Sequence, residues 1–481
     1  SNSARALHSQ KMNLELLLGD MPKQNTLTFT KKSELDFWTK KLNVKKSRFP
    51  ERKQPIKDHS HPAISVQMEA CIQCTRCLRA CREEQVNDVI GFAWRGKNAK
   101  IVFDFDDNIG SSSCVGCGEC VQACPTGALM EKSLLNDKGT VREVYPDKKI
   151  ESVCPFCGVG CRTEVSVKNN KIVAVDGIQG PANRGKLCVK GRFGMDYIMN
   201  PERLTKPLIR RKDVKKDPNC NYSFSDIKKV FREASWDEAL DLASNKFLKI
   251  LKEKGGQALS GFGSAKGTNE EAYLFQKFIR QGFGTNNVDH CTRLCHASSV
   301  AALMEGIGSG AVSNQVADVA EADTIIVIGA NPTVNHPVAA TFIKNAAKAG
   351  KNLIVLDPRK NDLARHATHY LQFKPDTDVA LLNAIMKSIV DQNLIDKNFI
   401  NERTTDFDDL KSHLDDFTPE KMSSICGIDA DVIHEVARIY ASSSASIIFW
   451  GMGVSQHIHG TDNARALISL ALMTCLLYTS P

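Results

Sequence analysis

The stretch CIQCTRCLRAC, residues 71–81, decides how this chain begins to fold, because it spaces four cysteines as C-x2-C-x2-C-x3-C. The stretch CVGCGECVQACP, residues 114–125, repeats that spacing and adds a proline. Twelve of the 17 cysteines fall between residues 71 and 188 in such short spacings. Disulfide frameworks belong mainly to small secreted proteins, so these cysteines indicate metal sites in a reducing compartment.

The spacing of the two runs is that of bacterial ferredoxins. There, three close thiolates of one run hold a [4Fe-4S] cluster, and the fourth ligates the other cluster. Structural zinc sites also use C-x2-C pairs, but two identical runs of four favour iron–sulfur clusters. The first cluster is therefore expected on Cys71, Cys74, Cys77 and Cys124, and the second on Cys81, Cys114, Cys117 and Cys120.

A third group of cysteines, spaced C-x2-C-x3-C-x26-C, begins in CPFCGVGC, residues 154–161. Its spacing differs from the ferredoxin run, which indicates a separate site. Zinc is the alternative, but a third [4Fe-4S] cluster is favoured because two clusters already make the chain an electron conductor. The expected ligands are Cys154, Cys157, Cys161 and Cys188.

The composition is that of a globular protein. The 481 residues are 42% hydrophobic and 25% charged, which suits about two to four domains. No apolar run reaches the roughly 18 residues of a membrane helix, and the first ten residues lack the apolar core of a secretory signal. We therefore expect a cytoplasmic protein without a membrane span.

The net charge of +8 comes largely from basic stretches such as RRKDVKK, residues 210–216. We interpret them as solvated linker surfaces or partner-docking surfaces. Nucleic-acid binding is disfavoured because no stacking aromatic side chains are interleaved with the charges.

Four regions follow one another along the chain. We expect a basic linker or remnant of a preceding iron–sulfur module over 1–62, a two-cluster ferredoxin domain over 63–147, a third [4Fe-4S] domain over 148–205, and an α/β catalytic region over 206–481. The expected fold class is thus an α+β ferredoxin-like module followed by α/β domains with parallel sheets.

The α/β region alternates helical and strand-like segments. Ser235 and Glu238 form a capping box that should begin a helix with an apolar stripe, and the Gly255–Gly256 pair should end it. Strands are expected over 324–329, 352–357 and 446–453. In such parallel sheets, ligands bind at the carboxyl ends of the strands.

From about residue 63 to 473 the chain resembles the molybdenum- or tungsten-bis(molybdopterin guanine dinucleotide) oxidoreductases, and among them the metal-dependent formate dehydrogenases. CPFCGVGC and GKLCVKGR, residues 185–192, look like that family's cluster-binding domain. Lys190 matches the lysine that lies between cluster and pterin in the family, which implies a role in electron passage.

The stretch DHCTRLCH, residues 289–296, carries the substrate-site resemblance. Cys295 matches the cysteine or selenocysteine that ligates the metal in formate dehydrogenases, and His296 the adjacent histidine implicated in proton handling. A soft thiolate and an imidazole suit these roles, although a cysteine taken alone is more often structural. Cys291 is interpreted as structural and Arg293 as a local packing or salt-bridge residue.

Further segments are similar to the family's pterin and guanine nucleotide contacts. Each would be a weak signal alone, but turns at strand ends expose backbone amides to phosphates and carboxylates can receive guanine. The implied contacts are Gly329, Asn331, Asp357, Arg359, Asp376, Asp378, Gly451, Met452 and Gln456.

The resemblance implies oxidation of formate to carbon dioxide and transfer of two electrons through three clusters to a flavin- and NAD-binding diaphorase subunit. Periplasmic nitrate reductases, the first alternative, carry Met after the ligand cysteine. The second alternative is an electron-transfer subunit like the large iron–sulfur subunit of complex I. The first 62 residues lack the cysteines of longer relatives, and the family's substrate-positioning arginine is missing, so we expect a catalytic subunit truncated at both ends.

Overall fold

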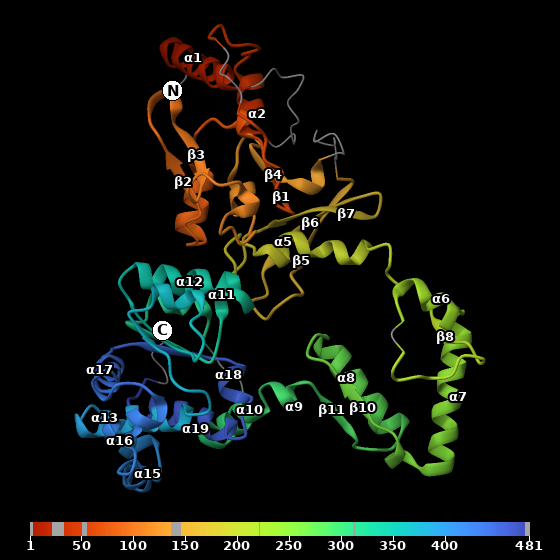
Figure 1. Ribbon diagram of the computed structural model, residues 1–481, viewed down its shortest axis with the longest axis vertical. Coiled ribbons are helices and arrows are strands. Elements are labelled where there is room, and N and C mark those ends of the chain that lie inside the picture. Colours follow the sequence, from red (N-terminus) through yellow and green to blue (C-terminus); the bar gives the residue numbers. More distant parts are fainter. Residues whose placement is uncertain are drawn as a thin grey trace. The chain divides into compact units, whose positions relative to one another are not determined.

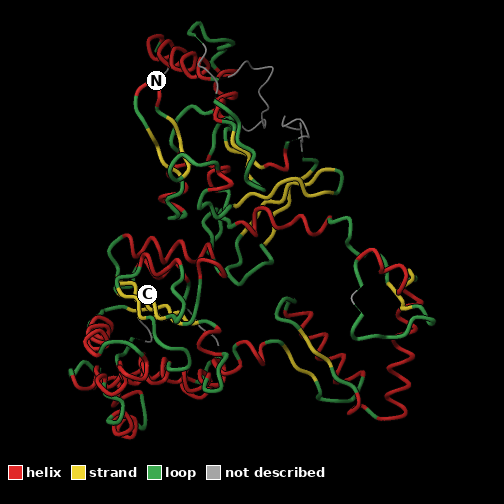
Figure 2. The backbone as a smooth tube through the Cα atoms, in the orientation of Figure 1, coloured by secondary structure: helices red, strands yellow, loops and turns green. Residues whose placement is uncertain are grey.

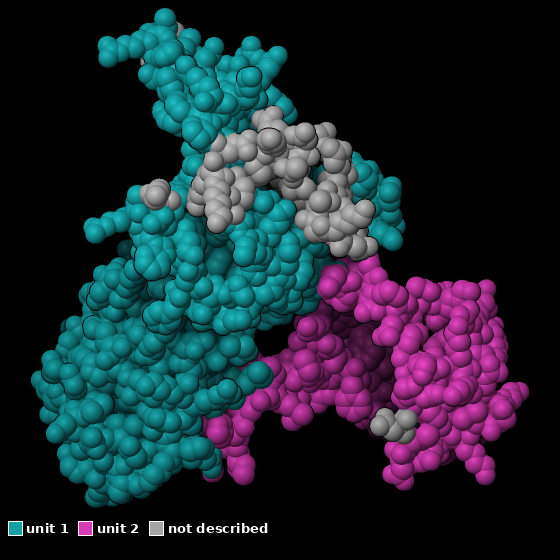
Figure 3. Space-filling view, turned by 45° about the horizontal axis from the view of Figure 1, so that its top comes forward, with its two compact units in different colours: residues 1–195, 312–453, 466–481 teal, residues 196–311, 454–465 magenta. Residues whose placement is uncertain are grey.

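The computed structural model describes residues 3–21, 33–50, 55–135, 146–220, 222–310 and 314–476. Many of its elements are labelled in Figure 1. It divides into two compact units, shown in different colours in Figure 3. The first unit comprises Ser1–Met195, Val312–Gly453 and Ala466–Pro481, and the second comprises Asp196–Ala311 and Val454–Arg465.

The first unit begins with helices α1 (Ala4–Asp20) and α2 (Glu34–Lys41), within the segment interpreted as a linker. Ser3 and Ser33 cap them by accepting hydrogen bonds from backbone amides in the first turn. Their apolar side chains pack with Ala70 and Ala128 and contact two cysteines of the predicted cluster motifs. Part of this segment therefore belongs to the packed domain, while residues 22–32 and 51–54 lie outside the description.

The cysteine-rich module contains two antiparallel strand pairs, β1 with β4 and β2 with β3. A short helix starts inside each ferredoxin-like run, α3 in the first and α4 in the second. Both helices are preceded by a residue in the left-handed conformation, Thr75 (φ 60°) and Gly118 (φ 74°). The bounds are β1 (Ile64–Val66), α3 (Arg76–Arg79), β2 (Ile90–Ala93), β3 (Lys100–Phe103), α4 (Glu119–Ala123) and β4 (Leu129–Glu131).

A three-stranded antiparallel sheet follows, made of β5 (Lys148–Val153), β6 (Arg162–Lys168) and β7 (Lys171–Gly177). Asn169 and Asn170 both have positive φ and form the tight turn between β6 and β7. Two left-handed residues suit a two-residue hairpin because their twist matches that of the strands. Helix α5 (Val189–Phe193) follows directly after the last cysteine of the third group.

The α/β part of the first unit contains a parallel four-stranded sheet in the order β14-β13-β12-β15. Buried aliphatic side chains fill its central strands, and helices flank it (Figure 2). The strands are β12 (Thr324–Ile328), β13 (Asn352–Leu356), β14 (His369–Leu371) and β15 (Ser446–Trp450). The three strands expected from the sequence therefore form, and β14 adds a fourth.

The helices around the sheet include α12, whose buried face packs on the strands. The other helices of the first unit are α11 (Pro332–Asn335), α13 (Asp378–Asp391), α14 (Lys397–Arg403), α15 (Phe407–Leu414), α16 (Pro419–Cys426) and α17 (Ala430–Ala441), and α12 spans Pro337–Lys348. Two helices, α18 (Met452–Ser455) and α19 (Gly460–Met473), include residues of both units.

The second unit has a small apolar core that includes Leu259, Ile279 and Phe283. Strands β8 and β9 pair antiparallel, whereas β10 and β11 pair parallel. Its elements are β8 (Leu208–Arg210), α6 (Ile227–Val230), β9 (Phe231–Glu233), α7 (Trp236–Lys254), β10 (Gly261–Gly263), α8 (Asn269–Lys277), β11 (Val288–His290), α9 (Thr292–Cys295) and α10 (Ala297–Ile307).

Helix α7 confirms the helix predicted after Ser235, with two differences. Ser235 Oγ accepts a hydrogen bond from the Glu238 amide (3.1 Å), but the Glu238 carboxylate pairs with Arg232 instead of returning to the cap. The predicted apolar stripe is only partly covered, since Leu240 is 60% exposed. The capping box is therefore half formed.

The expected order of an α+β cysteine-rich module followed by α/β structure with a parallel sheet is confirmed. Among the described residues, no helix is both long enough and apolar enough to cross a membrane.

Candidate functional site

The two ferredoxin-like runs fold in the same way around their first cysteine. The Gln73 amide donates a hydrogen bond to Cys71 Sγ at 3.4 Å, and the Gly116 amide donates to Cys114 Sγ at the same distance. Equal sequence spacing has thus produced equal local geometry. Backbone N–H groups directed at sulfur stabilise a thiolate, the form in which cysteine binds metals.

Eight cysteines of the two runs line two small cavities, each with three cysteines of one run and the fourth of the other. The free volume inside each is about 20 Å³. Cavity one is lined by Cys71, Cys74, Cys77 and Cys124, and cavity two by Cys81, Cys114, Cys117 and Cys120. The cysteines are thus brought together in the groups expected from the spacing.

The third group of cysteines lines cavity three, with a free volume of about 10 Å³. Pro337 and Val338, at the start of α12, close one side of it. Three of its cysteines also belong to the apolar core that includes the strands β12 and β13. The lining cysteines are Cys154, Cys157, Cys161 and Cys188.

The surroundings of these thiols suit a metal cluster. Burial raises the pKa of Cys77, Cys117 and Cys161 to about 12 each, so a free thiol there would be protonated near neutral pH. Thiophilic iron in a cluster displaces that proton and supplies the compensating positive charge. Among the described residues, no group of three or more His, Cys, Asp or Glu side chains is placed to chelate a single ion.

Cavities two and three are joined by a buried ion pair that sequence reasoning missed. Arg192, on α5, donates from Nε to the Cys117 carbonyl (3.0 Å) and from Nη2 to Glu119 Oε1 (2.7 Å). The same carboxylate oxygen accepts the Leu187 amide at 3.0 Å. A Cβ at Gly118 would lie 2.2 Å from Arg192 Cδ, so glycine is required there. In the sequence, Gly118 is the only signal that could have indicated the contact with Arg192.

Lys190, predicted between cluster and pterin, lies on α5 two residues after Cys188. Its Nζ donates to the carbonyl of Val334 at 3.2 Å. Val334 belongs to α11, which follows β12. Lys190 therefore joins the helix at cavity three to the segment after the carboxyl end of β12.

Glycines from two neighbouring strand ends pack backbone against backbone at the carboxyl edge of the sheet. The Gly453 amide donates to the Gly329 carbonyl at 3.0 Å, and the Gly451 amide donates to the Ile328 carbonyl at 3.3 Å. A Cβ at Gly451 would lie 2.7 Å from the Gly329 carbonyl oxygen. The two predicted cofactor-binding turns therefore meet, and Met452 lies between Gly451 and Gly453.

The carboxyl end of β13 contributes Asp357 and Arg359 to the same edge. Asp357 Oδ1 accepts the Arg359 amide at 2.8 Å, and partial burial raises the pKa of the Asp357 carboxyl. Asn361, from the same turn, donates to the carbonyl of Ala330 at 3.5 Å and so links this turn to the one after β12.

The other predicted contacts of the first unit are distributed as follows. Asn331 immediately precedes α11, and its Oδ1 accepts the Thr333 hydroxyl at 2.6 Å. Asp376, with positive φ, lies in the exposed turn after β14, and Asp378 is buried at the first position of α13.

Cys295 and His296 lie in the second unit at the junction of α9 and α10, and both are partly buried. His296 Nδ1 lies 3.3 Å from Ser455 Oγ. Ser455 Oγ is in turn 2.6 Å from Ser299 Oγ, and its carbonyl accepts the Ser298 hydroxyl at 2.8 Å. The start of α10 is thus bound to the segment that follows β15.

Gln456, a predicted cofactor residue, donates through its side-chain amide to the carbonyl of Leu294, next to Cys295. Arg293 forms the expected local salt bridge, with Nε 3.1 Å from Asp289 Oδ2. Cys291 is exposed and its Sγ accepts the Ala265 amide at 3.2 Å, a contact within the unit's own backbone.

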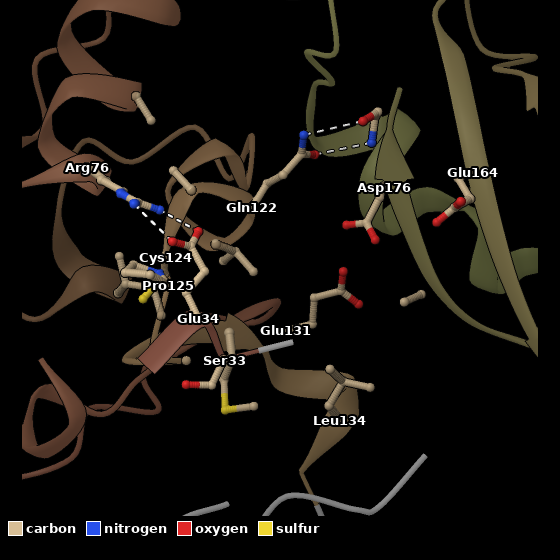
Figure 4. Close-up of a pocket in the computed structure, with 18 of the residues that line it drawn as sticks. Ser33, Glu34, Arg76, Gln122, Cys124, Pro125, Glu131, Leu134, Glu164 and Asp176 are labelled. Carbon is tan, nitrogen blue, oxygen red and sulfur yellow. Dashed lines mark hydrogen bonds and ion pairs between the residues drawn. The ribbon is translucent and has the colours of Figure 1, made fainter. Parts of the chain in front are cut away.

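A larger pocket adjoins cavity one (Figure 4). Arg76 and Glu34 form a two-pronged ion pair at its edge, with distances of 2.5 and 3.0 Å. Glu131, Glu164 and Asp176 line the open space, so its wall is acidic. Carboxylates repel phosphate groups, and a nucleotide cofactor is therefore not expected in this pocket.

Three family models match the chain. "Molybdopterin oxidoreductase" matches residues 203–479, "Molybdopterin oxidoreductase Fe4S4 domain" matches 147–200, and "4Fe-4S dicluster domain" matches 70–128. The first model alone spans more than half of the chain. Together they confirm the fold class: a dicluster domain followed by molybdopterin oxidoreductase domains with parallel sheets.

The names of curated relatives agree with an oxidoreductase family. "Probable oxidoreductase YjgC" of Bacillus subtilis (strain 168) is 34% identical over 478 residues, covering 92% of this chain and 47% of that protein. A "Putative formate dehydrogenase" of Staphylococcus aureus (strain USA300) is 34% identical over 459 residues, covering 88% and 45%. The chain spans about half the length of the curated relatives it matches.

Among solved structures, acetylene hydratase from Pelobacter acetylenicus is similar with a TM-score of 0.60 and 24% identity. The likeness covers 69% of this chain and 44% of that one. At this identity it indicates a shared fold and nothing of the reaction.

Proposed function

Because the chain belongs to the molybdopterin oxidoreductase family, with an Fe4S4 domain and a 4Fe-4S dicluster domain, we propose that it acts in a formate dehydrogenase. It would be the catalytic subunit, oxidising formate to carbon dioxide. The observation that carries this proposal is the adjacent Cys295 and His296 at the start of α10, with His296 oriented by Ser455. The names of the Staphylococcus relatives support it.

Formate oxidation releases carbon dioxide, one proton and two electrons. Molybdenum or tungsten on two molybdopterin guanine dinucleotides supplies the two-electron chemistry when it is bound. Cys295, at the end of the short helix α9, would hold the metal, because a thiolate is a soft ligand.

His296 would receive the proton. A neutral imidazole nitrogen can accept a proton, and the contact between Nδ1 and Ser455 Oγ restricts the orientation of the His296 ring. Ser455 is held by two further serines of α10, so the ring position depends on a small hydroxyl network.

The strand ends would hold the pterin guanine dinucleotides. Gly451 and Gly453 leave no room for side chains where they pack against the backbone of Gly329, so a cofactor could approach the backbone closely there. Asp357 has a carboxylate that could receive the edge of guanine. The other proposed contacts are Asn331, Arg359, Asp376, Asp378, Met452 and Gln456.

Electrons would pass by Lys190 to the cluster of cavity three and then to those of cavities two and one. Two contacts support this order: Lys190 with Val334 after β12, and Arg192 with Cys117 between cavities three and two. Cys74 of cavity one is exposed, which suits transfer to a partner. We propose a flavin- and NAD-binding subunit as that partner, and a reducing compartment, the cytoplasm, as the location.

The test determines which substrate reduces or reoxidises the clusters in the full-length protein. Anaerobic addition of formate should bleach the visible iron–sulfur absorbance, and metal analysis should find molybdenum or tungsten with pterin. Reoxidation by nitrate without a response to formate would replace the proposal with a nitrate reductase. Iron without molybdenum, tungsten or pterin would replace it with an electron-transfer subunit.

A further inference from the structure

A buried lysine of the α/β part reaches into the dicluster domain. Lys344, on α12, is 5% exposed. Its Nζ donates to the carbonyls of Gln85 (2.6 Å) and Val86 (3.2 Å) and to Asn87 Oδ1 (3.0 Å). These residues follow the helical turn Ala80–Glu84 that contains Cys81, a lining residue of cavity two.

All three acceptors of Lys344 are uncharged. In the described part of the chain, no carboxylate lies within salt-bridge distance of its Nζ, and the nearby Asp88 pairs with Arg82 at 3.5 Å. Lysine is almost never fully buried without a partner, because removing an ammonium group from water is strongly unfavourable. The position therefore calls for an anion nearby.

The surrounding charges indicate where that anion lies. Burial lowers the pKa of Lys344 to about 8, with a further lowering by Arg365, while Cys117, Cys81 and Asp88 act in the opposite direction, the two cysteines ahead of Asp88. Both cysteines line cavity two. A [4Fe-4S] core held by four thiolates is an anion and gains one more negative charge when it is reduced.

We propose that Lys344 is the counter-cation of the cluster in cavity two and that its charge favours the reduced form of that cluster. The step concerned is the one-electron reduction of the oxidised cluster, with the electron supplied by the neighbouring cluster. The inference rests on the proposed assignment of clusters to cavities and is independent of the substrate.

The other cations near the cavities differ from Lys344 in one respect. Arg192 is buried but paired with Glu119, and Arg76 beside cavity one is half exposed and paired with Glu34. Their charges are largely compensated by carboxylates. The charge of Lys344 should therefore act on cavity two more strongly than either arginine acts on its own neighbouring cavity.

The experiment compares Lys344→Gln, which removes the charge and keeps a hydrogen-bond donor, with Lys344→Arg, which keeps the charge. Lys348→Gln is the matched control, since Lys348 lies one turn further along α12, is exposed, and donates to the Arg82 carbonyl at 3.3 Å. The chain is reconstituted anaerobically, its iron is measured, and each cluster is titrated by electron paramagnetic resonance. The signal altered in Cys114→Ser identifies the cluster of cavity two.

In Lys344→Gln, the equilibrium constant for reduction of that cluster should fall about tenfold. This corresponds to a midpoint potential lower by about 59 mV for a one-electron couple. Lys344→Arg and Lys348→Gln should remain close to the unaltered protein. Loss of about four iron atoms in Lys344→Gln but not in Lys344→Arg would also support the proposal, because the charge would then be needed to hold the cluster.

Unchanged midpoints with full iron in Lys344→Gln would overturn the inference, as would an equal shift in Lys348→Gln. Equal iron loss in the Gln and Arg variants would reduce Lys344 to a packing role. A different result would overturn the assignment of clusters to cavities. In that case the unaltered protein would contain only about eight iron atoms per chain, and Cys114→Ser would alter none of its signals. None of these outcomes depends on oxidation of formate.

Discussion

Cys120 and Cys295 are both proposed metal ligands, yet their surroundings differ. Cys120 is 6% exposed, belongs to the apolar core of the dicluster domain, and has its pKa raised well above the ordinary value by burial. Cys295 is only partly buried, and the adjacent Leu294 is 80% exposed. The proposed cluster ligand Cys120 therefore also contributes to the core, whereas Cys295 contributes little to it, so substitutions should separate effects on stability from effects on activity.

The largest effect is expected for Cys295→Ala in the full-length protein. Formate oxidation should be abolished while iron stays at about 12 atoms per chain, because the clusters use other thiolates. Cys291→Ala is the matched control and should retain activity, since the Cys291 sulfur contacts only the Ala265 amide among the hydrogen bonds described. X-ray absorption at the molybdenum or tungsten edge should lose one protein sulfur in the first variant alone. The reverse pattern would exchange the roles of the two cysteines.

His296→Gln should lower the rate of formate oxidation by about 10²- to 10⁴-fold, the usual contribution of a positioned proton acceptor. Metal content and iron should be unchanged. Ser455→Ala removes only the hydroxyl beside Nδ1 and should have a smaller effect of the same kind. Equal rates for His296→Gln and the unaltered enzyme would remove proton transfer from the role of this residue.

Cys120→Ser tests the other side of the comparison. It should remove about four of about 12 iron atoms and also lower the unfolding temperature, because Cys120 lies in the core. Cys220→Ser, at an exposed position, should change neither quantity. Full iron and unchanged stability in Cys120→Ser would show that cavity two is not a cluster site.

The smallest effect concerns two glycines with similar left-handed backbone. At Gly118 (φ 74°) a Cβ would lie 2.2 Å from Arg192 Cδ, whereas at Gly284 (φ 65°) nothing lies within 4 Å. Gly118→Ala should therefore cost about 3 kcal/mol in unfolding free energy, from strain and overpacking, and Gly284→Ala about 1 kcal/mol from strain alone. Hydrogen exchange of the amides around each glycine measures both. Equal losses of unfolding free energy in the two variants would mean that the Arg192 side chain moves aside to accommodate the added methyl group.

Much of the candidate site could be predicted because its signals are local. The four-cysteine spacings predicted which thiols line the same cavity. Apolar runs predicted strands over 324–329, 352–357 and 446–453, and the observed strands end one to three residues earlier. Less was predictable in the second unit. The stripe of α7 indicated a covered face, but Leu240 is mostly exposed, because a periodic pattern shows which side is apolar and does not show what lies against it.

The sequence by itself determined the three cysteine groups, the order of the modules and the Cys295–His296 pair, since each depends on residues a few positions apart. Only the tertiary structure decided that Arg192 joins cavities two and three and that Lys344 lies beside cavity two. Lys344 and Gln85 are 259 residues apart in sequence, and no local pattern at either residue refers to the other. Their contact arises because α12 packs on both the sheet and the dicluster domain, so burial and charge there depend on the folded chain.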